Sequence, residues 1–215
     1  MRIGILGSGG VARTLGTGFV RLGHDVMLGS RTADNPNATL WRDETGGMIG
    51  SLAEAAAFGA VIVNALNGAA SLEAITGLDP TSLAGKVLID VANPLDFSNG
   101  FPPSFTVSNT DSLAEQLQRT LPEVHVVKAL NTVNTSVMVD PGALHEATDL
   151  FICGNDADAK QTVTGLLVEL GWSAERVRDL GDLSAARGTE AYLALWVRLM
   201  SALGTPTFNV RLVAE

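Results

Sequence analysis

Residues 3–12 read IGILGSGGVA, an apolar run that leads directly into a glycine-rich turn. The turn has the form G-x-G-x-x-A, in which each small residue has a physical role. Gly7 permits the sharp exit from a strand, Gly9 has no Cβ to obstruct a pyrophosphate, and Ala12 lets a helix pack closely on the strand. The N-terminus of that helix would offer unpaired N–H groups and a positive dipole end to an anion.

The surroundings of this motif favour a dinucleotide site over an ordinary glycine turn. The motif alone is weak evidence, because glycines also cluster in structural turns. Here it lies between an apolar strand and a helix-like segment at residues 13–22, and a second strand-like run follows at residues 25–28. That order is typical of dinucleotide-binding units. The residues predicted to bind the cofactor in this turn are Gly7, Ser8, Gly9, Gly10, Val11 and Ala12.

The residues after the second strand indicate which dinucleotide binds. A site for NAD usually places Asp or Glu there, and the carboxylate accepts a hydrogen bond from the 2′-hydroxyl of the ribose. This chain has Ser30 and Arg31 instead. A planar guanidinium suits a phosphate, and a hydroxyl adds a donor. The alternative is that Arg31 is only a solvated loop charge. We predict NADP (NADPH) as cofactor, with its 2′-phosphate held by Ser30 and Arg31.

Composition is typical of an α/β protein with one substantial domain. Of the 215 residues, 46% are hydrophobic and 5% aromatic. The formal net charge of -9 argues against a nucleic-acid partner, because binding a phosphate backbone needs a basic surface. The single cysteine, Cys153, ends an apolar run and is predicted to be a core residue in a reducing cytoplasm. The apolar runs are too short or interrupted to predict a signal peptide or a membrane span.

Strand-like and helix-like segments alternate along the chain, which predicts an α/β fold with a doubly wound, mostly parallel sheet of the Rossmann type. A polar loop is predicted at residues 34–47, with one helical turn near Trp41. Ser51 and Glu54 then form a capping box that begins a short helix. Residues 96–110 are predicted to be a long ordered loop. Further strands are predicted at 60–63, 86–91, 124–130, 150–153 and 176–178, and helices at 70–76, 111–121 and 157–170.

Small polar residues follow three of these strands. The carboxyl ends of parallel strands meet at one edge of the sheet, where ligands bind. Asn93 and Pro94 are also a common turn former, so a purely structural role is the alternative at that point. The residues predicted to contact the cofactor are Asn64, Ala65, Leu66 and Asn93, and those predicted to contact the substrate are Pro94, Asn131 and Thr132.

We expect residues 1–180 to form the NADP-binding Rossmann domain and residues 181–215 to form a small helix-plus-strand segment. The segment would contain a helix at 183–203 and a terminal strand at 207–213, and would pack on the site or on a dimer partner. Two apolar stripes on the helix imply burial on two sides. One stripe holds Ala186, Leu193, Val197 and Met200, and the other holds Ala191, Leu195, Leu199 and Ala202.

Four segments of the chain resemble the NADP-dependent oxidoreductases related to the reductase of the deazaflavin coenzyme F-420. These oxidoreductases belong with Rossmann proteins such as the catalytic domain of pyrroline-5-carboxylate reductase. The resemblance runs over most of the chain, and GSRT and the closing DLGD with its helix are its more specific parts. The segments are GILGSGGVARTLGTGFVRLGHDVMLGSRT, VLIDVANPL, VVKALNTV and DLGDLSAARGTEAYLALWVRLM.

This resemblance implies NADPH bound at Gly7 to Ala12, with its 2′-phosphate on Ser30 and Arg31. It also implies that hydride passes to an acceptor in a small apolar cavity near the C-terminal segment. One position departs from the deazaflavin reductases, which tend to have His where this chain has Asn131. The departure leaves room for a flavin, a quinone, an imine or another small acceptor.

No acid or base is predicted, and the catalytic residues stay unknown. Hydride transfer between two rings depends on proximity, orientation and exclusion of water. The only tyrosine, Tyr192, is followed four positions later by Trp196, so no Tyr-x-x-x-Lys pair exists. Asp182 and Glu190 are expected to be caps or ion-pair partners. No metal site is predicted, because the histidines are scattered at His24, His125 and His145.

The sequence therefore predicts an NADP(H)-dependent oxidoreductase that transfers hydride between the nicotinamide and a small or planar acceptor. Its partner would be that small-molecule acceptor, with neither nucleic acid nor a membrane as partner, and the protein would be a cytoplasmic homodimer. The alternative is a redox sensor that binds NADP(H) without turnover, which the lack of a committed acid or base leaves open.

Overall fold

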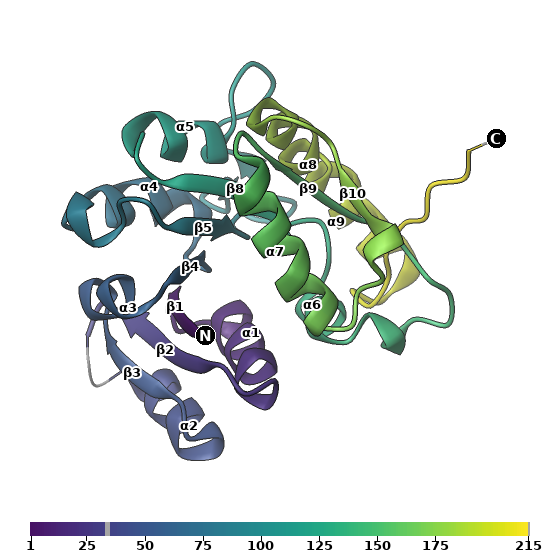
Figure 1. The fold of residues 1–215 in the computed structure, drawn as a ribbon. Coiled ribbons are helices and arrows are strands. Elements are labelled where there is room, and N and C mark those ends of the chain that lie inside the picture. Colours follow the sequence, from purple (N-terminus) through teal and green to yellow (C-terminus); the bar gives the residue numbers. More distant parts are fainter. Residues whose placement is uncertain (33–34, 215) are drawn as a thin grey trace.

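Eight strands pair in one sheet in the computed structural model, which describes residues 1–32 and 35–214 (Figure 1). They are β1 (Arg2–Leu6), β2 (Asp25–Ser30), β3 (Met48–Ser51), β4 (Val61–Asn64), β5 (Val87–Asp90), β8 (His125–Ala129), β9 (Leu150–Gly154) and β10 (Val177–Asp179). Their order is β10-β9-β8-β5-β4-β1-β2-β3, and every neighbouring pair is parallel except β8 and β9. The predicted doubly wound, mostly parallel sheet is confirmed.

Helices cover both faces of this sheet, so its inner strands are buried on both sides. This burial explains why β1 is an apolar run, in which Ile3 and Ile5 are fully buried. One core cluster lies under α1 (Gly10–Arg21), α2 (Pro36–Thr45), α6 (Thr135–Val139) and α7 (Ala157–Glu169). The other lies under α3 (Leu52–Phe58), α4 (Gly68–Thr76) and α5 (Leu113–Thr120). Short 3₁₀ turns are η1 (Pro80–Ser82), η2 (Pro141–Ala143) and η3 (Ala174–Arg176).

The strand order changes direction between β1 and β4. From β1 the chain lays β2 and β3 on one side, and then returns to place β4, β5 and β8 on the other side. Open α/β sheets bind their ligands outside the carboxyl ends of the strands at such a switch point. The loops that follow β1, β4 and β5 therefore lie where a ligand is expected to bind.

The prediction of a loop at residues 34–47 is wrong for the residues that the structure describes there, because most of them form helix α2. The Asn35 side chain accepts from the N–H groups of Asn37 and Ala38, Pro36 takes the first helical position, and Gly46 ends the helix with φ +75°. Trp41 is buried, and its indole N–H donates to Thr17 Oγ1 at 3.1 Å. Tertiary packing of Trp41 thus stabilises a helix that the polar composition of the segment did not predict. Residue 34 lies outside the described residues.

The predicted loop at residues 96–110 contains a small antiparallel hairpin of β6 (Leu95–Asp96) and β7 (Ser104–Phe105). The helix predicted at 183–203 is divided into η4 (Leu183–Ala185), α8 (Ala186–Ala191) and α9 (Leu193–Leu203). Its first stripe packs as expected, since Ala186, Leu193 and Val197 are buried. Asp182 caps η4 by accepting from the Ser184 N–H at 2.9 Å, which confirms its predicted role as a cap.

The terminal strand predicted at 207–213 is wrong, because the structure has no strand there. One buried residue, Asp149, makes three of the contacts that hold the tail. Asp149 Oδ2 accepts from the Leu212 N–H at 2.6 Å, and its own N–H donates to the Val210 carbonyl at 3.0 Å. Asn209 Nδ2 donates to the Asp149 carbonyl at 2.9 Å. Because side chains supply two of these three contacts, no regular ladder forms.

Cys153 is fully buried, and burial raises the pKa of its thiol to about 12, which confirms it as a core residue. Over residues 1–32 and 35–214, no helix combines the length and the apolar character needed to cross a membrane. The same residues include no group of three or more His, Cys, Asp or Glu side chains that could hold a metal ion.

Asp149 anchors the C-terminal tail through its charge. Burial raises the pKa of this carboxyl, but the hydrogen bonds from the Leu212 N–H and the Arg178 guanidinium outweigh burial and hold the pKa below its usual range. Asp149→Asn should therefore lower the free energy of unfolding by about 2 kcal/mol at neutral pH, measured by urea denaturation.

This stabilisation should depend on pH in a defined direction. Since the folded-state pKa of Asp149 is lowered, the stabilisation is complete above the unfolded-state value of about 3.9 and is lost as the pH falls through the folded-state value. The difference in the free energy of unfolding between the wild type and Asp149→Asn should therefore become smaller as the pH is lowered. Glu146→Gln is the control, because its ion pair with Arg211 is exposed. Equal stability of the two variants would contradict the assignment.

Candidate functional site

The turn after β1 is shaped to leave backbone groups open. Gly7 has φ +126°, and a Cβ there would lie 2.7 Å from the Ala65 carbonyl oxygen, so only glycine fits. At Gly9 and Gly10 an added Cβ would meet nothing within 4 Å. The turn therefore has a tight inner side and an open outer side, and the open side is where a ligand could approach the backbone.

Helix α1 begins without a side-chain cap. Its N-cap is Gly9, and the first bond within the helix is donated by the Arg13 N–H to the Gly9 carbonyl at 3.0 Å. The N–H groups before Arg13 have no acceptor in the helix. The next six α-helices each begin at a residue whose side chain accepts from a backbone N–H: Asn35, Ser51, Asn67, Ser112, Asn134 and Asp156. The contrast fits an anion, such as a pyrophosphate, as the missing cap of α1.

A groove crosses the carboxyl edge of the sheet beside this helix end. It consists of two adjoining cavities of about 460 and 210 Å³, both bordered by Ala65, Leu66 and Asn67 from the loop after β4. Val11 and Asn93 border the smaller cavity, and Ala12 is buried under the helix as close packing requires. The larger cavity is also lined by Gly7, Ser8, Gly9, Ser30 and Arg31, and the smaller cavity by Val91, Ala92, Leu95 and Phe97.

The two ends of the groove differ in chemistry. At the end of β2, Arg31 is exposed on the larger cavity and supplies a cation. Ser30 is buried, and its hydroxyl donates to the Thr32 carbonyl, so it supports the turn as well as facing the cavity. At the end of β5 the smaller cavity is mostly apolar, with the Asn93 amide at its border. This asymmetry fits a ligand with a phosphate at one end and a flat ring at the other.

Asn64 lies inside the sheet and lines neither cavity. It is fully buried; its Nδ2 donates to Asp90 Oδ1 at 2.8 Å, and its Oδ1 accepts from the Leu66 N–H at 3.2 Å and the Ser71 hydroxyl at 3.3 Å. Any role of Asn64 toward a cofactor therefore acts through the loop that it holds. Its side chain fixes Leu66, which does border the groove.

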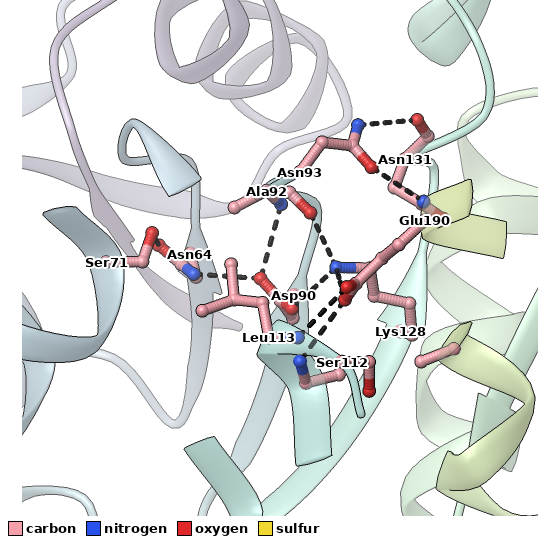
Figure 2. A network of polar contacts seen from close by, with 12 residues as sticks. Asn64, Ser71, Asp90, Ala92, Asn93, Ser112, Leu113, Lys128, Asn131 and Glu190 are labelled. Carbon is pink, nitrogen blue, oxygen red and sulfur yellow. Dashed lines mark hydrogen bonds and ion pairs between the residues drawn. The ribbon is translucent and has the colours of Figure 1, made fainter. Parts of the chain in front are cut away.

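Asn93 and Asn131 form a reciprocal amide pair (Figure 2). Asn93 Nδ2 donates to the Asn131 carbonyl at 2.8 Å, and Asn131 Nδ2 donates to Asn93 Oδ1 at 2.9 Å and to the Thr189 carbonyl at 3.0 Å. Pro94 and Thr132 are buried beside the pair in the chain. Within the described residues, Asn131 Oδ1 and Thr132 Oγ1 have no hydrogen-bond partner. Their roles toward a substrate remain a prediction.

A buried ion triad lies behind this pair, and sequence reasoning missed its centre (Figure 2). Lys128 is almost completely buried, and its Nζ lies 2.8 Å from Asp90 Oδ2 and 2.8 Å from Glu190 Oε1. Glu190 also accepts from the N–H groups of Leu113 and Ala114, which confirms its expected role as an ion-pair partner and cap. A lysine within the apolar run VVKAL, paired in register with Asp90, was the available signal.

The electrostatics of the triad keep Lys128 charged. Burial lowers the pKa of Lys128, but the carboxylates of Asp90 and Glu190 together raise it above its ordinary value. For Glu190, burial raises the pKa by more than the attraction of Lys128 lowers it. Glu190 shares the Lys128 ammonium with Asp90, and the negative charge of Asp90 adds to the rise in the pKa of Glu190.

Gly68 is a second residue that the sequence did not mark. A Cβ at Gly68 would lie 1.8 Å from the Asn93 carbonyl oxygen, so the loops after β4 and β5 touch at a point where only glycine fits. In the sequence, Asn67-Gly68 is a dipeptide typical of an ordinary turn. The contact brings the two loops together on the floor of the smaller cavity, which both residues line or border.

The fold and the groove define a dinucleotide-binding α/β protein, and comparison with known proteins identifies the family. Residues 2–94 match the family model for "NADP oxidoreductase coenzyme F420-dependent". A crystal structure from Arthrobacter sp. FB24, provisionally assigned as an F420-dependent NADP reductase, is 45% identical, with full coverage of both chains and a TM-score of 0.95. The chain belongs to this family of NADP-dependent oxidoreductases. Membership confirms the predicted resemblance and, for the family, the predicted cofactor NADP.

Curated relatives extend the comparison over longer proteins. Rat Metalloreductase STEAP3 is 32% identical over 96% of this chain and 38% of its own length. The F420-dependent NADP reductase of Methanocaldococcus jannaschii is 32% identical over 54% of this chain and 52% of its own. The chain thus spans about two fifths to one half of these relatives. A reductive aminase from Aspergillus terreus in complex with NADPH, 21% identical with a TM-score of 0.68, shares the fold.

The open side of the glycine turn leads to a test that separates binding from stability. Gly9→Ala should weaken NADPH binding at least about tenfold, or ~1.4 kcal/mol, because the new Cβ occupies the approach to the helix N-terminus. Its melting temperature should stay within about 3 °C of the wild type, since nothing lies within 4 Å of that Cβ. Calorimetric titration and thermal unfolding measure the two effects.

Gly10→Ala is the matched control, because it also adds one methyl group in open space but at a variable position of the motif. It should leave NADPH affinity nearly unchanged. Equal losses of affinity in the two variants, or unfolding caused by Gly9→Ala, would show that the turn is built for packing and not for a ligand.

Proposed function

We propose that this chain binds NADPH along the groove and transfers hydride from the nicotinamide to a small or planar acceptor. The observation that carries this proposal is the uncapped N-terminus of α1, which opens on a cavity that also holds Arg31. Gly7 to Ala12 would hold the pyrophosphate through backbone N–H groups. Ser30 and Arg31 would hold the 2′-phosphate, and Ala65, Leu66 and Asn93 would border the nicotinamide.

The chain's own residues would act by positioning. NADPH supplies the hydride when it is bound. The apolar residues Val91, Leu95 and Phe97 border the smaller cavity and would exclude water from the reacting rings. The Asn93–Asn131 pair is fixed by reciprocal hydrogen bonds and would orient what lies against it. The nearby ionisable residues Asp90, Lys128 and Glu190 are engaged with one another, so the proposed catalysis uses proximity and orientation.

The acceptor is proposed from the relatives together with the cavity. The M. jannaschii relative is named for F420, a deazaflavin, and the rat relative is named as a metalloreductase. A flat ring suits the smaller cavity, in which Phe97 is an exposed aromatic wall. Asn131 replaces the histidine that deazaflavin reductases tend to have, so we include flavins, quinones and imines among the candidates.

An acceptor panel tests the proposal. The protein is mixed with NADPH and, in turn, with a deazaflavin, a flavin, a quinone and a cyclic imine, while the absorbance of reduced nicotinamide is followed. We expect oxidation with at least one planar acceptor. Tight NADPH binding without oxidation across the panel would favour the redox-sensor alternative, and no affinity for NADPH or NADH would reject both.

Arg31 should determine the choice between NADP and NAD. Arg31→Ala removes the charge-assisted hydrogen bonds to the 2′-phosphate, and we expect NADPH affinity to fall roughly 10- to 100-fold while NADH affinity changes little. Titration calorimetry with both nucleotides measures the ratio. Arg42→Ala, which removes a surface arginine paired with Asp43, is the control. An unchanged ratio in Arg31→Ala would show that Arg31 is a solvated loop charge.

We also propose that the protein is a homodimer, in keeping with the domain arrangement expected from the sequence. The second apolar stripe supports this proposal, because Leu195 on α9 is 55% exposed although Leu193 and Val197 of the first stripe are buried. Sedimentation equilibrium of the full chain would test it.

The position of β10 supports the proposed division of the chain into residues 1–180 and 181–215. This strand is the last one of the sheet along the chain, and it ends at Asp179.

A further inference from the structure

Lys128 contacts three separate parts of the chain from the centre of the sheet. Its Nζ lies 2.8 Å from Asp90 at the end of β5 and 2.8 Å from Glu190 on α8, and it donates to the Ala92 carbonyl at 2.5 Å (Figure 2). All three partners are buried. One ammonium therefore joins a sheet strand, the loop that follows the strand, and the C-terminal helical segment.

Asp90 connects Lys128 to the loops that border the groove. Its Oδ1 accepts from Asn64 Nδ2 at 2.8 Å and from the Ala92 N–H at 3.2 Å. Asn64 in turn holds the N–H of Leu66, which borders both cavities. A continuous series of polar contacts thus runs from Glu190, through Lys128 and Asp90, to Asn64 (Figure 2). The Leu66 N–H extends it to the loop that borders both cavities.

The Ala92 carbonyl is the link between Lys128 and the amide pair. Lys128 fixes the oxygen of the peptide that joins Ala92 to Asn93, and Asp90 fixes the N–H of Ala92. Lys128 and Asp90 therefore fix the backbone just before Asn93, and Asn131 fixes the Asn93 side chain. Asn131 also donates to the carbonyl of Thr189, the residue before Glu190. Both sides of the amide pair are tied to the triad.

Core stability alone does not call for a charge at this position. The residues on either side of Lys128 within β8, Val127 and Ala129, are apolar, and well-packed hydrophobic residues stabilise a core as well as a buried ion triad does. What an ammonium adds is direction, because it binds two carboxylates and a carbonyl in one fixed geometry. That geometry ends at Asn93, on the border of the smaller cavity.

We propose that Lys128 is a positioning residue: together with Asp90 and Glu190 it fixes the loop at residues 91–94, so that the Asn93–Asn131 pair orients the nicotinamide end of the bound cofactor. The inference rests on the proposed function, in which that end of NADPH lies against Asn93. Because Glu190 belongs to the C-terminal segment, the docking of this segment and the orientation of the nicotinamide would be coupled.

Two ligands separate this role from general support of the fold. The first, 2′,5′-ADP, fills only the end of the groove near Arg31, and NADPH fills both ends. For Lys128→Met in the full chain, we expect the Kd of 2′,5′-ADP to stay within about twofold of the wild type and the Kd of NADPH to rise about tenfold. The fluorescence of the bound nicotinamide should also shift toward that of free NADPH.

The matched control is Lys160→Met. Lys160 also bonds a carboxylate and a carbonyl, those of Asp179 and Gly181, but at the far edge of the sheet. It should change neither Kd nor the nicotinamide fluorescence. Asn93→Ala should reproduce the selective loss of NADPH affinity. If Lys128 acts through the Asn93–Asn131 pair, adding Lys128→Met to Asn93→Ala should lower NADPH affinity little further.

Glu190→Gln keeps the test decisive if Lys128→Met does not fold. The amide oxygen of glutamine can still accept from the Leu113 N–H, while the charge on Lys128 loses one partner. A selective but smaller loss of NADPH affinity is expected. If the variants weakened the binding of 2′,5′-ADP and NADPH equally, or changed neither Kd, the positioning role would be overturned. A wild-type protein that binds neither ligand would instead reject the proposed function, and the inference with it.

Discussion

The backbone N–H groups at the start of α1 are the constraint on which the site depends. A helix N-terminus must find acceptors, and in α2 to α7 the chain supplies them from Asn, Ser or Asp side chains. At Gly9 it supplies none. The sheet places this open end at the switch point, where the strand order changes direction between β1 and β4, and Arg31 follows the neighbouring strand β2. A dinucleotide phosphate would act as the missing cap, so the same groups that destabilise the free helix end would bind the ligand.

The far end of the groove is organised on a different principle. There the chain surrounds a mostly apolar cavity with loops that are held from within the sheet. Gly68 allows the loops after β4 and β5 to touch, and Lys128 fixes the peptide before Asn93. Burying Asp90, Lys128 and Glu190 together costs free energy that their mutual contacts offset. The arrangement makes the border of the cavity rigid, which suits chemistry that depends on how two rings are oriented.

Local patterns predicted the parts of the structure that depend on local physics. The glycine turn, the capping box of Ser51 and the apolar strands each follow from short-range rules, and the position of Arg31 follows from the order of strand, turn and helix. Helix α2 was missed because it depends on Trp41, whose ring packs so tightly on Gly47 that an added Cβ there would lie 2.0 Å away. No local pattern contains that contact.

The missed features of the site have the same origin. The partners of Lys128 come from three distant parts of the chain, and the tail lacks a strand because Asp149 anchors it with its side chain. Only the register of β5 and β8 brings Asp90 beside Lys128. A charge inside an apolar strand could have been taken as a sign of a buried partner, but its identity required the fold.

Amide NMR of the ¹⁵N-labelled chain during titration with NADPH tests the central claim most directly. The account predicts large downfield shifts for the N–H groups of Gly9, Gly10 and Val11, since each would gain or approach a phosphate acceptor, with further changes at Ser30 and Arg31. Saturable NADPH binding that leaves these signals in place and shifts residues elsewhere would contradict it.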